Sequence, residues 1–179
     1  MITINLKLNR LKLVFVSAFA LNISCVSING YSATATSNLL VTATVTSACI
    51  IVTVPVAFGV YDPTLGIPLD VPGAVTVTCT LGSTTPYVTL GQGANPSAGS
   101  TDAVPLRQMA GTVTATDLLS YELYSDALRT TVLGNTGITG IAHIGTGLPV
   151  VIPIYGRIPV GQNVPSGSYL DTVIATITF

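Results

Sequence analysis

The feature that most constrains this chain is a two-residue alternation of apolar and polar side chains, repeated in short segments. In the segment 118–126 (LLSYELYSD), Leu119, Tyr121 and Leu123 share one parity, and mostly polar residues occupy the other. A period of two places alternate side chains on opposite faces of a β-strand. No segment of the sequence keeps the 3.6-residue period of an amphipathic helix. The alternation therefore predicts an all-β fold.

Strand patterns recur along the chain and are separated by Gly, Pro, Asn and Asp. Besides the segment above, strands are expected at 49–58, 74–80, 148–159 and 168–179, with short ones inside 86–96 and 134–147. In the segment 74–80 we expect Val75, Val77 and Cys79 to share a face. The prolines of 148–159 suggest an edge strand or a bulge, and 59–73 is interpreted as a turn-rich link. Six or seven short strands at this spacing are typical of a β-sandwich.

The first 35 residues are interpreted as an export signal. Three basic residues open the chain, 11–28 is mostly apolar, and Ala33-Thr34-Ala35 offers the small-x-small pattern of a signal peptidase site. Cleavage is expected after Ala35, with Ser32 as the second choice. An uncleaved anchor and a lipoprotein site ending at Cys25 remain as alternatives.

Charge is scarce in the mature chain. Removing the signal leaves three arginines against seven acidic residues, a net charge of −4. No basic patch exists to bind nucleic acid or an anionic membrane. So little charge also suggests surfaces buried against neighbours. Each arginine is expected to pair with an acid or a carbonyl, Arg157 with Asp171 across a hairpin.

Two cysteines remain after cleavage, Cys49 and Cys79. An even pair in an exported protein favours a disulfide, and two free buried thiols are the alternative. With His143 as the single histidine, the cysteines do not make a structural zinc site.

Nothing in the sequence points to catalysis. His143 has no acid nearby in sequence, so a nucleophile–base–acid site is not indicated. The glycines at 91–93 lack the lysine of a phosphate-binding loop. Tyr121 and Tyr124 are candidates for a sugar-stacking platform, which the few aromatic residues support only weakly. We expect no enzyme activity, cofactor or metal.

The two ends of the mature chain carry the longest alternations. The segment 38–49 (NLLVTATVTSAC) reads as a strand with one apolar face, although nothing precedes it to pair with. The last strand is expected to run to Phe179 without a turn back. We therefore expect a domain that has one strand too many at its N-terminus and lacks one strand at its C-terminus.

Several sequence motifs occur along the chain in this order: FGVYDP, VTVTCTLG, PLRQM, LLSYELYSD and, from Ile154, IYGRIPVGQNVPSGSYLDTVIATITF. Together with Cys49 and Cys79 they resemble the spore coat protein U domain family, which includes subunits of archaic chaperone–usher pili. The resemblance covers Leu39 to Phe179, and its C-terminal phrase is the most specific part.

The resemblance implies an incomplete immunoglobulin-like β-sandwich that lacks its last strand and is completed by donor-strand exchange. It divides the chain into a signal peptide (1–35), a donor-strand extension (36–47) and a pilin-like domain (48–179). The donor side chains would be Leu39, Val41, Ala43 and Val45. The acceptor-groove edge, which also contacts the chaperone, would be Val173, Ala175, Ile177 and Phe179.

The function implied is that of a structural subunit of a surface pilus that supports adhesion and biofilm formation. Its partners would be neighbouring copies or related pilins, a periplasmic chaperone and an outer-membrane usher. The chain would be exported through the periplasm to the cell surface. A secreted spore or cell coat protein, and an adhesive module at a fibre tip, are the alternatives.

Overall fold

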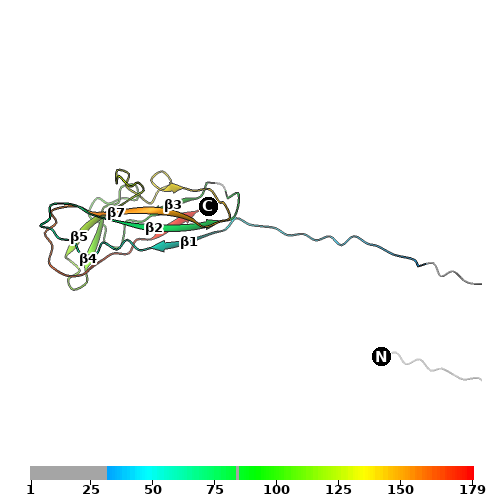
Figure 1. Ribbon diagram of the computed structural model, residues 1–179, viewed down its shortest axis with the longest axis horizontal. Helices are drawn as coiled ribbons and strands as arrows, with labels where there is room; N and C mark the ends of the chain where they lie inside the picture. Colours follow the sequence, from blue (N-terminus) through cyan, green and yellow to red (C-terminus); the bar gives the residue numbers. More distant parts are fainter. Residues whose placement is uncertain (1–31, 84) are drawn as a thin grey trace, which may run out of the picture. The chain divides into compact units, whose positions relative to one another are not determined.

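The computed structural model describes residues 32–83 and 85–179, in which all regular structure is β-strand (Figure 1). The chain divides into two units after Thr42, and every strand lies in the second unit. The strands are β1 Cys49–Val54, β2 Leu69–Cys79, β3 Tyr87–Leu90, β4 Arg107–Gly111, β5 Leu118–Tyr124, β6 Ile141–Ala142, β7 Val150–Ile158, β8 Tyr169–Leu170 and β9 Ala175–Thr178. The all-β prediction is confirmed. The described residues contain no helix with the length and apolarity that a membrane crossing requires.

Two antiparallel sheets enclose the core. The larger has the order β1-β2-β7-β5-β4-β8, and the smaller has the order β6-β3-β9. Both sheets contribute buried side chains, so the apolar faces meet between them as in a sandwich. The core consists of Val75, Val77, Val88, Leu90, Leu119, Tyr121, Leu123, Leu133, Ile152, Ile154 and Ile158.

The alternation correctly assigns the inward faces. Val75, Val77 and Cys79 on β2 are buried, as are Leu119, Tyr121 and Leu123 on β5. In the last segment, odd-numbered residues from 169 to 177 are half-buried and the even-numbered ones are exposed. Parity is a local property of a strand, which explains why the sequence predicts it well.

The prediction of an edge strand at 148–159 is wrong for the strand as a whole. β7 lies between β2 and β5. However, β5 pairs with β7 only at residues 155–157, so Pro153 lies where β7 has a single neighbour, opposite Ala74 of β2. The missing N–H of the proline is tolerated there because one side of the strand has no ladder.

Several strand boundaries differ from the prediction. β1 ends at Val54 rather than Phe58, and β2 begins at Leu69, inside the region interpreted as a link. Gly73 is suited to this part of β2 because a Cβ there would lie 2.5 Å from the Val56 side chain. β4 has no alternation in its sequence and was not predicted. The segment 168–179 forms two strands, β8 and β9, separated by 171–174.

Candidate functional site

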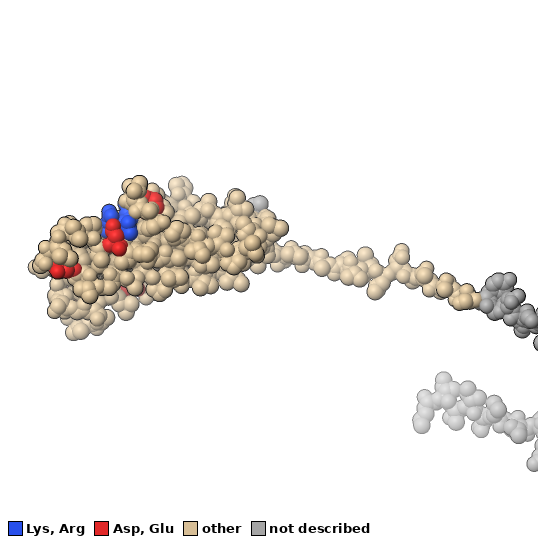
Figure 2. All heavy atoms as spheres, viewed as in Figure 1, with Lys and Arg blue, Asp and Glu red and all other residues tan. Residues whose placement is uncertain are grey.

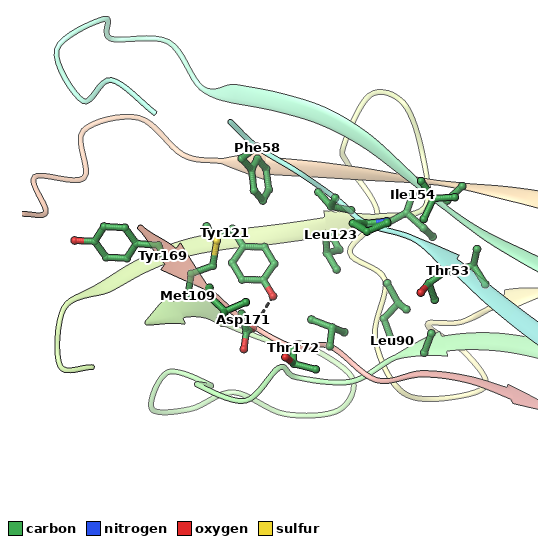
Figure 3. Close-up of a pocket in the computed structure, with 18 residues that line it drawn as sticks. Thr53, Phe58, Leu90, Met109, Tyr121, Leu123, Ile154, Tyr169, Asp171 and Thr172 are labelled. Carbon is green, nitrogen blue, oxygen red and sulfur yellow. Dashed lines mark hydrogen bonds between the residues drawn. The ribbon is translucent and has the colours of Figure 1, made fainter. Parts of the chain in front are cut away.

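A groove opens into the core between two strand edges (Figure 3). One wall is the end of β1 with the segment that follows it, and the other is the segment from β8 to β9. Two adjoining hollows of about 420 and 750 Å³ make up this groove. They share Val56, Phe58, Met109 and Tyr169 as lining residues. The core is therefore accessible from outside along this line.

Core side chains form the floor of the groove. Val75 of β2, Leu90 of β3, Tyr121 and Leu123 of β5 and Ile154 of β7 all line the first hollow. Phe58 packs edge-on against the Tyr121 ring, with the ring centroids 5.9 Å apart. An apolar side chain inserted here would meet the main core and not a surface depression.

Both walls carry open strand edges. Among the described residues, β1 is paired only with β2 and β9 only with β3. Each strand therefore has one edge whose N–H and C=O groups lack a ladder partner. Such edges are templates for pairing with another chain. The groove thus combines open apolar surface with open backbone hydrogen-bonding groups.

The structure places the four predicted groove-edge residues differently from one another. Val173 and Ala175 line the groove. Ile177 packs against the core and lies opposite Val88 of β3, outside the groove lining. Phe179 is 55% exposed and does not line the groove. Whether these residues contact a partner stays a prediction.

The predicted donor residues make no strand in the single chain. Residues 32–48 are assigned no secondary structure. Leu39, Val41 and Val45 are 88%, 82% and 87% exposed, and Ala43 is exposed as well. The donor role of the segment 36–47 also stays a prediction. Most of the proposed signal peptide, residues 1–31, lies outside the described residues.

A polar pair sits at the side of the apolar groove. The Tyr121 hydroxyl donates a hydrogen bond to Asp171 Oδ2 at 2.6 Å, and the backbone N–H of Ala94 donates to Asp171 Oδ1 at 2.8 Å. Burial, with the carboxylate nearby, raises the pKa of Tyr121 well above its usual range. Gly93 allows this approach, because it has φ +85° and a Cβ there would overlap the Asp171 carboxylate. Asp171, in the segment between β8 and β9, therefore connects this segment to β5 and to the loop after β3.

The predicted ion pair between Arg157 and Asp171 is wrong. Arg157 forms two hydrogen bonds of 2.7 Å to the carboxylate of Asp70. Asp70 and Arg157 are direct cross-strand partners on β2 and β7, a pairing hidden from the sequence because the start of β2 was not predicted. Arg129 lies 3.2 Å from the same carboxylate. The Arg157 hydrogen bond holds the pKa of Asp70 below its usual value.

Arg107 is buried beside the groove, and its guanidinium donates hydrogen bonds to three backbone carbonyls and one carboxylate. It donates to the carbonyls of Leu90 at 3.0 Å, Gly91 at 2.9 Å and Leu133 at 2.7 Å, and to Glu122 Oε2 at 3.2 Å. Burial lowers the pKa of Arg107 and raises the pKa of Glu122, and the attraction between the two opposes both shifts. The prediction that Arg107 pairs with an acid or a carbonyl is confirmed.

The disulfide between Cys49 and Cys79 is confirmed. These residues are the first cross-strand pair of β1 and β2. The bond therefore ties the wall strand of the groove to a strand that contributes to its floor. It lies at the point where the segment 36–47 joins the sandwich.

The remaining candidate residues do not assemble into a site. Tyr121 is buried while Tyr124 lies on the opposite face of β5, so the two rings do not form one platform. In the described part of the chain, no three of the His, Cys, Asp and Glu side chains come together to hold a metal. The groove is therefore the candidate functional site.

Comparison with known proteins agrees with this architecture. The relative Protein U of Myxococcus xanthus is 52% identical over 157 residues, which are 83% of this chain and 87% of that protein. A solved structure with a similar fold is the CsuC–CsuE chaperone–tip adhesion subunit pre-assembly complex from the archaic chaperone–usher Csu pili of Acinetobacter baumannii. That match has a TM-score of 0.55 and 22% identity, and covers 76% of this chain but 40% of that one.

At this identity the solved structure shows the fold alone, an immunoglobulin-like sandwich of the kind found in pilus subunits. The family comparison is more specific, because the sequence model described as Spore Coat Protein U domain matches residues 35–176. The match spans the extension and nearly the whole sandwich. This chain therefore belongs to the spore coat protein U domain family.

Proposed function

We propose that this protein is a structural subunit of a surface fibre assembled by a chaperone–usher pathway through donor-strand complementation. The observation that carries the proposal is the groove, which exposes the core between two open strand edges. The fold shared with a Csu pilus complex supports it. In the fibre, segment 36–47 of one copy would fill the groove of the next.

The extension and the groove are chemically complementary. Leu39, Val41, Ala43 and Val45 lie on one parity, so a strand built from them presents a continuous apolar face. Burying these side chains would stabilise the assembly by roughly 5–8 kcal/mol. Backbone hydrogen bonds to the open edges add about 0.5–1.5 kcal/mol each, and the cost of ordering the extension offsets part of the gain.

Before assembly the same groove needs a temporary occupant, since an open edge beside an open core favours aggregation. A periplasmic chaperone would supply this strand and contact Val173, Ala175, Ile177 and Phe179. An outer-membrane usher would then exchange the chaperone for the next subunit. The exported fibre would support adhesion and biofilm formation at the cell surface.

A coat function is the second candidate, and the relationship to Protein U favours it. The same strand exchange would then build a spore or cell coat instead of a fibre. Immunogold labelling distinguishes the two, because a pilus subunit labels filaments that project from the cell and a coat protein labels the cell or spore envelope.

The deciding experiment moves the donor strand. A copy of residues 38–47 is fused behind Phe179 through a flexible linker, and the natural copy is deleted. Several kcal/mol of added stability should raise the melting temperature by at least about 10 °C relative to the mature chain and give a monomer. A matched fusion that carries Val41→Asp should lose this gain. Equal melting temperatures for all three proteins would mean that the sandwich is complete alone.

A further inference from the structure

Hydrogen bonds and the disulfide fix the end of the sandwich at which the extension begins. Ala48 and Thr80 exchange two hydrogen bonds, one from the Ala48 N–H to Thr80 Oγ1 at 3.2 Å and one from the Thr80 N–H to the Ala48 carbonyl at 2.9 Å. The Ser47 and Ser83 hydroxyl oxygens are 2.8 Å apart, and the disulfide follows at Cys49. The sandwich therefore holds the chain from Ser47 onward.

Large apolar side chains surround this point. Ile50, Leu81, Ile144 and Leu148, which we call the root patch, are 68%, 82%, 74% and 67% exposed. Ile50 lies on β1, and the other three residues lie on two turns that pack together. The Gly82 N–H donates to the Gly145 carbonyl at 3.1 Å, and the Gly147 N–H donates to the Cys79 carbonyl at 3.0 Å. The root patch is thus an apolar surface formed by the start of β1 and two turns that hydrogen bonds hold together.

The turns of the root patch lie in segments without charged residues. The segments 71–101 and 130–156, which contain its turns, have no Asp, Glu, Lys or Arg. On the face shown in Figure 2, the coloured charged side chains lie towards the end of the sandwich opposite the one that the extension enters. Exposed apolar surfaces without charge are typical of the centre of protein–protein interfaces.

The length of the connection determines which partner covers this surface. Under the proposed function, Val45 is the last side chain of the extension that enters the neighbour's groove, and Ala48 is bound to its own domain at Thr80. Three residues span at most about 11 Å even when fully extended. We propose that the root patch is a second interface, packed against the copy that receives the extension, so that adjacent subunits are in direct contact.

The proposal rests on the proposed function and is tested on assembled polymers of the wild-type chain by hydroxyl-radical footprinting. The reference is the donor-fused monomer described above. Oxidation of Leu81, Ile144 and Leu148 should fall severalfold in the polymer, whereas oxidation of Leu128, which is 81% exposed and on the loop after β5, should not change. Equal oxidation of the root patch in both states would overturn the second interface alone. Failure of the chain to polymerise by strand exchange would overturn the proposed function together with it.

Variants provide an independent readout. Leu81→Ser, Ile144→Ser and Leu148→Ser combined should leave the melting temperature of the donor-fused monomer unchanged, because these side chains are exposed. Polymers of this variant should still form, with a broader distribution of angles between adjacent subunits in electron micrographs. Leu128→Ser should match the wild type. An angle distribution in the combined variant identical to that of the wild type would contradict the proposal.

Discussion

The surroundings of Arg107 and the groove differ in how many of their polar groups find a hydrogen-bond partner within the chain. Around Arg107 the chain supplies every partner: three carbonyls and the Glu122 carboxylate surround a buried guanidinium. Along the groove the same core is open, and among the described residues one edge of β1 and one edge of β9 have no ladder partner. The first region is complete within the chain. The second is open, and under the proposed function a second chain completes it.

The closed region should be the most sensitive to substitution. Arg107→Met leaves the half-buried Glu122 without its cation and three carbonyls without a donor, so it should cost about 3–5 kcal/mol of unfolding free energy. Because burial raises the pKa of Glu122, the loss should shrink as the pH falls towards 4.5 and the carboxylate takes up a proton. Urea unfolding of the donor-fused monomer measures both effects. Arg157→Met is the control at an exposed pair. An equal loss of unfolding free energy in both variants would show that the surroundings of Arg107 are no more sensitive than a surface ion pair.

The wall of the groove depends on a cross-link, since β1 has a single neighbour. Replacing both Cys49 and Cys79 with serine opens a loop with a sequence separation of 30 residues. The expected loss is about 3–4 kcal/mol in the chain-entropy model. Urea unfolding of the variant should coincide with that of the wild type under reducing conditions. A variant as stable as the oxidised wild type would show that the rest of the fold holds β1 in place.

The open region can be tested with two adjacent residues of opposite parity. Val173 lines the groove, whereas Ile174 is 71% exposed. In the donor-fused monomer, Val173→Asp would place a carboxylate against the inserted strand and should cost at least about 2 kcal/mol. Ile174→Asp should cost much less. Similar losses in both variants, measured by urea unfolding, would mean that the donor strand does not cover the groove.

The smallest effect is expected at the surface ion pairs of Asp70. The Arg157 hydrogen bond lowers the pKa of Asp70, so the pair stabilises the fold above pH 3.8 and loses this contribution as the pH falls through the lowered pKa. Asp70→Asn should therefore cost less than about 1 kcal/mol at neutral pH. The difference from the wild type should vanish in strong acid. A difference independent of pH would assign the effect to packing instead.

The candidate site was predictable in part. The alternation of the last segment correctly predicts Val173 on the inward face, and the resemblance predicts an open strand edge in this segment. The other wall of the groove was not predicted, because residues 55–58 follow the end of β1 and were expected to continue it. The bond between Tyr121 and Asp171 was missed as well, since it joins residues 50 positions apart.

The sequence by itself determined the all-β class, the inward parity of β2, β5 and the segment 168–179, and the disulfide partners. These properties follow from a two-residue period and from an even cysteine count, both of which are local or global features of the sequence. Only the tertiary structure decided which strands are neighbours, that Asp70 and not Asp171 binds Arg157, and that the core opens between β1 and β9. Strand order brings together residues that are far apart along the chain, and the periodicity of the sequence carries no information about these long-range contacts.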